Sequence, residues 1–253
     1  MANPYKELRL AIEKGDSLKV NELLDSGLSM EVGHVLAAIQ NKDTIMLKLF
    51  LDRGWDINTD VSNIIPSALV YTFEDMKLLK WFLSHGANPN KSCRIRDCTP
   101  LSFAVRDASL DIVKCLFEHG GQVQHGQLLH YASMRTRDSN CEVLRFIYNL
   151  DPGYNKLRIN NLLDEGSRNY LMNERSGLCT PLHYAAICGS VDRVNFLLDK
   201  GAIPDLLDPY RRSAISYAIY NRHDDVEQLL KERLTGETTR AILVDGSHID
   251  GIS

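Results

Sequence analysis

Apolar side chains recur along the chain in short stretches separated by turn-forming residues. In the clearest stretch, 180–201, Leu182 and Ala185 share one helical face, and Val194 and Leu197 share another. Each run has the period of a helix but spans only about eight to eleven residues, which is too short for an isolated helix to persist in water. The pattern predicts pairs of short helices that become stable by packing on neighbouring pairs.

Helix boundary signals stand at the ends of these runs. Thr180 is placed as an N-cap, with Pro181 at the first helical position. Gly86 and Gly201 follow second runs, where a helix commonly ends in a left-handed residue. These signals predict where the two helices of a pair begin and end.

The same succession of residues returns along the chain. Thr180-Pro181-Leu182-His183-Tyr184-Ala185 leads to Gly201, and Thr99-Pro100-Leu101-Ser102-Phe103-Ala104 leads to Gly120 over the same distance. Related stretches start near positions 6, 33, 65, 99, 127, 180 and 213. Helix pairs are therefore expected at all seven positions.

The TPLHYA run at 180–185 and the six related units resemble the ankyrin-repeat family, whose unit of about 33 residues carries a TPLH-x-A signature. The resemblance covers roughly residues 6–235. It implies an all-α solenoid of about seven helix-turn-helix units joined by short β-hairpin fingers. We expect 1–253 to form a single ankyrin-repeat domain.

The spacing between starts predicts where the fingers are complete. Two intervals, those that begin at 6 and at 99, are shorter than the family period. Fingers are expected near 56–64, 88–98 and 202–212, and reduced ones near 28–32 and 121–126.

The longest interval contains an insertion at 151–179, about twenty residues beyond the family period. It is too apolar for a disordered linker, so we expect a short helix around 160–165 that docks on the repeats. The favoured interpretation is a surface insertion that packs on its own flank; the alternative is a lid over the groove. At the other end, 237–253 is expected to be a tail whose apolar run 241–244 either covers the last helix pair or docks a partner.

A candidate binding surface comes from positions seven and eight of each unit, at the ends of the first helices. The resemblance places this row along a concave groove. It contains aromatic, methionine and arginine side chains, which are enriched at protein interfaces, although a solvated face with scattered apolar residues has the same composition. The candidate binding residues are Phe73, Arg106, Asp107, Met134, Arg135 and Tyr220.

A catalytic alternative uses Asp107, His130 and Arg135, the only polar residues of adjacent first helices that suggest an active site. It would be an acid–base isomerase, cyclase or hydrolase with the groove and the 151–179 insertion as its pocket. Against it, His130 and His183 occupy the histidine position of the motif, and the resemblance implies that this ring hydrogen-bonds backbone between repeats.

His85 and His119 precede the glycines that end second helices, where a helix terminus favours a cation. Six cysteines occur without a CxxC pair or zinc-type spacing, so reduced thiols are expected, and neither a metal nor a cofactor is predicted.

The net charge of −4 and the pI of about 6.1 argue against nucleic acid as a partner, since the chain has no basic stripe. No apolar run approaches the ~18 residues of a membrane span, so no membrane association is expected. The predicted location is cytoplasmic or nuclear. The favoured function is a scaffold that binds a protein through the groove and fingers; a small-molecule ligand and a structural subunit of a larger assembly are the alternatives.

Overall fold

The computed structural model describes residues 4–137, 141–165 and 178–246, with 236–246 described by their backbone alone. The chain divides into two compact units. The boundary runs through one helix: residues up to 104 group with the first unit, and 105–107 with the second.

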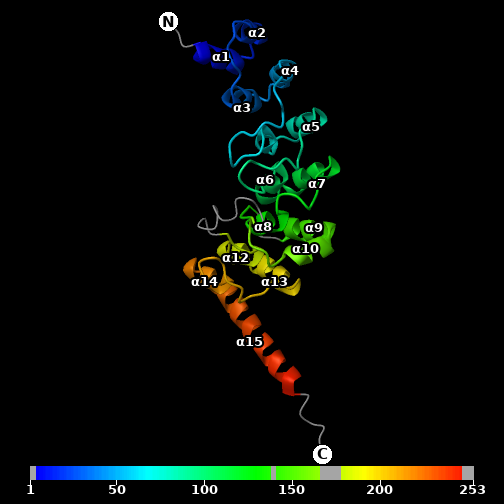
Figure 1. The fold of residues 1–253 in the computed structure, drawn as a ribbon, viewed down its shortest axis with the longest axis vertical. Coiled ribbons are helices and arrows are strands. Elements are labelled where there is room, and N and C mark those ends of the chain that lie inside the picture. The colour runs from blue at the N-terminus through cyan, green and yellow to red at the C-terminus, as the bar shows by residue number, and fades with distance from the viewer. Residues whose placement is uncertain (1–3, 138–140, 166–177, 247–253) are drawn as a thin grey trace, which may run out of the picture. The chain divides into compact units, whose positions relative to one another are not determined.

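Both units are built from pairs of short helices, which confirms the all-α class (Figure 1). In the described residues the sole β feature is an isolated bridge between Ser62 and Ile65. The first members of the pairs are α1 (Pro4–Glu13), α3 (Val32–Gln40), the 3-10 helix η1 (Ala68–Thr72), α6 (Pro100–Asp107), α8 (Leu128–Ser133), α12 (Pro181–Ile187) and α14 (Ala214–Tyr220). The second members are α2 (Ser17–Asp25), α4 (Thr44–Asp52), α5 (Met76–Ser84), α7 (Leu110–Glu118), α9 (Glu142–Leu150), α13 (Val191–Asp199) and α15 (Asp224–Gly246).

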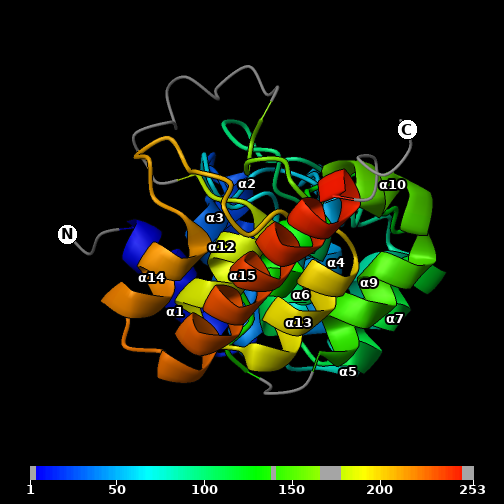
Figure 2. The ribbon, with the colours of Figure 1, turned by 90° about the horizontal axis from the view of Figure 1, so that it is seen from below.

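First helices pack on first helices. In the first unit α3 contacts α1 and η1. In the second unit α12 contacts α8 and α14, and Figure 2 shows α12 beside α14. Small side chains lie at these contacts: Ala38 in α3, Ala185 in α12 and Ala218 in α14 are fully buried. Alanine lets the backbones approach closely, and each helix covers apolar surface that its neighbour alone leaves exposed.

The predicted boundary signals are confirmed. The Thr180 hydroxyl accepts a hydrogen bond from the backbone N–H of His183, and Pro181 opens α12. Gly86 and Gly201 have φ values of +90° and +98°, the left-handed conformation that ends a helix at low cost in glycine.

The third pair departs from the expectation of two α-helices, because its first member is the 3-10 helix η1. The buried Thr72 hydroxyl donates to the carbonyl of Leu69, three residues back. Val70 and Thr72 are β-branched, which lowers their preference for an α-helix. A single tight turn therefore replaces the longer helix.

The expected helix at 160–165 is wrong: the insertion forms α10 (Pro152–Arg158) instead, and 160–165 lie outside any helix. Asp151 caps α10 by accepting from the N–H of Tyr154 at 3.0 Å, and Pro152 supplies the fixed φ of a first helical residue. α10 packs on α9, the helix that precedes it.

Backbone hydrogen bonds close the later fingers, and in the described residues strand pairing is limited to the Ser62–Ile65 bridge of the first finger. The N–H of Cys93 donates to the carbonyl of Cys98, and that of Asp208 to Arg212, each at 2.9 Å. The N–H of Leu163 makes the same kind of bond to Cys179 at 3.1 Å. The second part of the insertion is thus a lengthened finger, of which 166–177 lie outside the described residues.

Asparagines at the finger roots tie successive repeats together. In each case the side-chain NH2 group of the asparagine donates to the carbonyl of the glycine that ends the second helix of the following repeat. The side-chain oxygen of the same asparagine accepts from the backbone N–H two residues after that glycine. The three are Asn58 with Gly86 and Asn88, Asn90 with Gly120 and Gln122, and Asn160 with Gly201 and Ile203. The insertion therefore keeps the repeat's own root at Asn160.

The reduced fingers lie where they are expected. α3 begins at Val32, soon after α2 ends at Asp25, and the 121–126 connection is a short turn. At the other end α15 runs without a break to Gly246, so the backbone of the predicted tail begins as a continuation of the last helix. Among the described helices, none is both long and apolar enough to cross a membrane.

Candidate functional site

Side chains in the predicted binding row, or two residues after it, close the ends of the first helices. The last carbonyls of an α-helix have no partner inside the helix, so another group must supply a donor. Here the donor comes from the next repeat. The bonds are Asn41 Nδ2 to Glu13 (3.2 Å), Arg135 Nη1 to Val105 (2.6 Å), Arg137 Nη1 to Asp107 (2.7 Å), Cys188 Sγ to Met134 (3.4 Å) and His223 Nε2 to Ile187 (3.0 Å).

Arg135, one of the candidate binding residues, therefore does not reach solvent as a binding residue must. The residue is 2% exposed, and its guanidinium donates to the carbonyl of Val105 near the end of α6. This contact buries the side chain and gives it a structural task within the second unit. Arg135 supports the row from beneath.

Arg106 and Asp107 are accessible, but they pair with each other. Arg106 donates to Asp107 Oδ2 through Nε at 2.9 Å and Nη2 at 2.6 Å. The pair is partly exposed, so solvent screens it and its contribution to stability is small. Phe73, at the C-terminal end of η1, and Met134, at that of α8, are both half-buried.

His130 is a structural ring. It is 2% exposed, and its Nε2 is 2.8 Å from the carbonyl oxygen of Asn161. Burial lowers its pKa to about 4, so the ring is neutral near pH 7. His183 repeats the arrangement: Nε2 is 3.0 Å from the carbonyl oxygen of Arg212, and Nδ1 is 2.7 Å from Thr180 Oγ1. Both rings make the contact between repeats that the motif implies.

The three residues of the catalytic alternative are each committed elsewhere. Asp107 pairs with Arg106, His130 with the Asn161 carbonyl, and Arg135 with the Val105 carbonyl. A recess of about 430 Å³ lies near the row, and none of the three lines it; its walls are Thr136 and residues 188–193. This arrangement does not favour acid–base chemistry by these side chains.

The last finger, 202–212, is held by a buried carboxylate that sequence reasoning missed. Asp208 Oδ2 accepts from the Tyr217 hydroxyl at 2.6 Å and from Arg212 Nη2 at 2.9 Å. Its Oδ1 accepts from the backbone N–H groups of Tyr210 and Arg212, each at 2.8 Å. Burial alone raises the pKa of Asp208, but the bonds from Tyr217 and Arg212 outweigh burial and hold it below its ordinary value.

Aromatic rings add to this support. The Arg212 guanidinium carbon lies 4.6 Å from the ring centroids of both Tyr210 and Tyr217. Stacking of a guanidinium on two rings fixes the direction of each side chain. The finger is thus preorganised before any partner binds.

Exposed apolar side chains are frequent in this finger and in α14, the helix that follows it. Of the thirteen large hydrophobic residues exposed in the part of the chain with described side chains, five fall between 203 and 220. Tyr220, a predicted row residue, is 84% exposed at the end of α14. Exposed apolar side chains grouped in one segment of the chain make that segment a candidate interaction surface. We call it the terminal patch; it consists of Ile203, Leu207, Tyr210, Ile219 and Tyr220.

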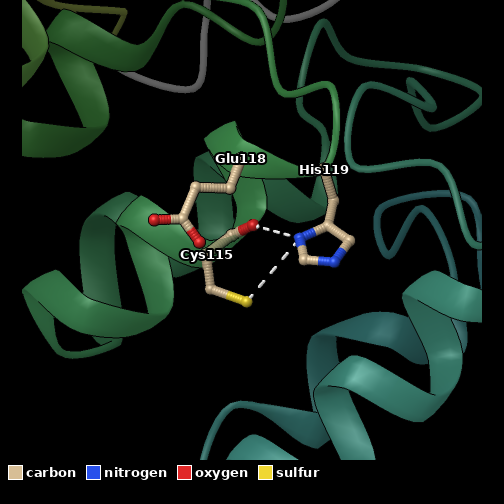
Figure 3. A group of neighbouring side chains, drawn as sticks. All are labelled: Cys115, Glu118 and His119. Atoms are coloured by element: carbon tan, nitrogen blue, oxygen red, sulfur yellow. Dashed lines mark hydrogen bonds between the residues drawn. The ribbon is translucent and has the colours of Figure 1, made fainter.

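A separate group, Cys115, Glu118 and His119, brings three potential metal ligands within 4.8 Å of one another at the end of α7. Figure 3 shows the His119 ring turned toward Cys115: its Nδ1 is 2.8 Å from the Cys115 carbonyl oxygen and 3.8 Å from Sγ. His85 makes the same 2.8 Å contact with the carbonyl of Trp81, where no cysteine is present. The histidine position is therefore explained by helix termination, as the sequence indicates.

With this geometry established, comparison with known proteins assigns the chain to a family. A family model of ankyrin repeats in three copies matches residues 68–158 and 153–239, together more than half of the chain. The chain belongs to the ankyrin-repeat family.

Curated relatives share the repeats over a shorter range. The ankyrin repeat, SAM and basic leucine zipper domain-containing protein 1 of Notamacropus eugenii is 30% identical over 114 residues, and that of Mustela putorius furo is 32% identical over 114 residues. Each match covers 41% of this chain but only 24% of the relative. The similarity therefore concerns the ankyrin repeats, which are generally protein-interaction modules.

The role of Asp208 in holding the last finger is only partly indicated by the sequence. Asp208-Pro209 is a turn-initiating pair, and an aspartate at such a site accepts backbone N–H groups two residues ahead. The bond between Asp208 and Tyr217 depends on how α14 packs under the finger, which no local pattern reports.

Proposed function

We propose that this ankyrin-repeat chain binds a protein partner through the last finger and the row at the ends of the first helices of the second unit. The observation that carries the proposal is the terminal patch. Leu207 and Tyr210 project from a finger fixed by Asp208, and Tyr220 projects from the adjoining first helix.

Preorganisation is the physical reason to place binding here. A surface that is already ordered loses little conformational entropy when a partner docks, so more of the contact energy appears as affinity. Tyrosine adds a large contact area and a hydroxyl group, and it is enriched among residues that dominate interfaces. The partner we expect is a protein segment with apolar side chains.

Met134, Arg106 and Asp107 extend the proposed surface along the same row of the second unit. Cys188 Sγ donates to the carbonyl of Met134, which places these two row positions side by side. Phe73 occupies the equivalent position of the first unit. A cytoplasmic or nuclear location is part of the proposal, since partners of this kind are met inside cells.

The test is quantitative affinity capture with the intact chain and two variants. Tyr220→Ala and Leu207→Ala each remove one exposed apolar side chain, and Leu18→Ala is the matched control, since Leu18 is 85% exposed at the start of α2. Truncation of an anchor residue costs about 1–3 kcal/mol, so partner recovery should fall at least about 5-fold with the first two variants. It should stay at the wild-type level with Leu18→Ala.

All three substitutions are at exposed sites, so the melting temperature should change little. If Tyr220→Ala and Leu207→Ala recover the same partners in the same amounts as wild type, the terminal patch is not the binding site.

A further inference from the structure

The finger at 88–98 holds two cysteines in direct contact. The Sγ atoms of Cys93 and Cys98 lie 3.0 Å apart, and the N–H of Cys93 donates to the carbonyl of Cys98 at 2.9 Å. The two residues are 6% and 2% exposed. The backbone bond that closes the finger therefore also fixes the two thiols beside each other.

The other fingers show that repeat geometry does not require this pair. The same closing bond joins Asp208 to Arg212 and Leu163 to Cys179, so neither of those fingers has a second thiol at the paired position. In this finger, four residues separate the cysteines, and Arg94 among them is exposed. A small oxidant has only this short turn to pass.

Cys93 differs from the buried thiols of the repeats. The hydrogen bond from the Cys98 thiol holds its pKa at about 6; burial opposes this shift, and backbone hydrogen bonds from Arg96, Ile95 and Cys98 reinforce it. Burial instead raises the pKa of Cys115 and Cys188. This shift favours the thiolate of Cys93, the form that reacts as a nucleophile.

We propose that Cys93 and Cys98 form a redox pair, in which hydrogen peroxide oxidises the two thiols to a disulfide that cross-links the finger. The Cys93 thiolate attacks one peroxide oxygen, the O–O bond breaks, and the departing hydroxide takes a proton and leaves as water. The product is a sulfenic acid on Cys93.

Cys98 is the resolving thiol. Its sulfur attacks the Cys93 sulfur, the S–O bond breaks, and the thiol proton leaves with the hydroxide as a second water. In sum, two thiols give up two electrons and two protons, and one peroxide becomes two waters. A dithiol reductant reverses the reaction by thiol–disulfide exchange.

The disulfide changes contacts between fingers of the first unit. The Cys98 thiol has the carbonyl of Ile64 as a second acceptor at 3.7 Å, and the N–H of Ile95 donates to the carbonyl of Asn63 at 3.3 Å. Oxidation removes the thiol proton and with it the first of these bonds. The tip of the preceding finger thus loses one of its ties.

Peptide mapping of the full chain after treatment with hydrogen peroxide tests the pair directly. Trypsin cuts after Arg94 and Arg96, which lie between the two cysteines, so only a disulfide keeps the Cys93 and Cys98 peptides together. We expect the intact mass to fall by two hydrogen atoms, and a linked peptide pair to appear that separates on reduction. Free thiols at both positions, after peroxide has oxidised other cysteines of the chain, overturn the proposal.

Single variants assign the two roles. Cys98→Ser should leave a sulfenic acid on Cys93 that dimedone traps, whereas Cys93→Ser should give little adduct on Cys98. Cys115→Ser is the matched control and should form the linked peptides as wild type does. An adduct on Cys98 in Cys93→Ser, with none on Cys93 in Cys98→Ser, contradicts the assignment of the attacking sulfur. The wild-type map stands even if a variant fails to fold.

Discussion

The fingers at 88–98 and 202–212 have the same backbone closure and different chemistry inside it. In each, an N–H donates to a carbonyl at 2.9 Å just before a first helix begins. The first finger then packs one thiol on another, whereas the second surrounds a buried carboxylate with a tyrosine, an arginine and two backbone N–H groups.

The repeat therefore determines the backbone conformation of a finger, whereas the side chains inside the finger can differ. The closing hydrogen bond fixes the backbone of both fingers. What fills the turn determines the condition to which the finger responds: oxidation in one case, acid in the other. It also determines how firmly the tip is held when a partner meets it.

The largest effect is expected from removing the buried charge of the last finger. Asp208→Asn takes the negative charge from beside Arg212 and turns an amide toward the Tyr217 hydroxyl. Asp208 is buried but the Arg212 side chain is 44% exposed, so the loss is that of charge-assisted hydrogen bonds to a buried carboxylate. Such a loss costs about 2 kcal/mol, and the free energy of unfolding should fall by that order. Asp205→Asn, at an exposed site of the same finger, is the control and should change it by less than about 0.5 kcal/mol. Equal effects of the two variants, measured by urea denaturation, would falsify the role given to Asp208.

Lowering the pH should reduce the difference in the free energy of unfolding between wild type and Asp208→Asn. The folded pKa of Asp208 is lowered from its ordinary value of 3.8, so its stabilising effect is complete above that pH and is lost as the pH falls through the folded pKa. The negative charge of Asp208 also raises the pKa of His183, so this ring titrates differently in the two proteins. Thermal unfolding at a series of pH values from 7 to 2 measures the difference. If the difference in the free energy of unfolding stays constant below pH 3.8, the Asp208 carboxylate is not the group that stabilises the finger.

The smallest effect concerns the roots that the fingers share. Asn90→Ala and Asn160→Ala each remove two hydrogen bonds at exposed positions, at the root of an ordinary finger and of the lengthened one. Each should lower the free energy of unfolding by about 1 kcal/mol, and by similar amounts. Chemical denaturation measures both variants. If Asn160→Ala alone leaves the free energy of unfolding unchanged, the hydrogen bonds of Asn160 do not stabilise the repeat next to the insertion.

The helix pairs could be predicted because their signals are local. Thr180 before Pro181, and Gly201 after an apolar run, mark boundaries through caps and backbone conformation that neighbouring residues alone determine. The signal for α10 was equally local, in Asp151 and Pro152. The apolar residues at 157–163 have a stronger helical pattern than 152–158, so they predict the helix too far along the chain.

The role of Arg135 could not be read in the same way. A charged side chain at the end of a short helix is usually exposed, and the pattern says nothing of the carbonyl on the preceding repeat that buries it. Tyr220 was identified correctly as an exposed row residue, whereas Phe73 and Met134 are half-buried. Position in the repeat predicts which residues share a row, but the neighbouring repeat determines which of them reach solvent.

The claim that the terminal patch binds a protein partner is tested most directly by hydrogen–deuterium exchange of the chain with and without its captured partner. If the partner docks there, exchange should be slower in peptides covering 203–220 and unchanged in α2 and α4. Protection confined to α2 and α4, with 203–220 unchanged, contradicts the claim.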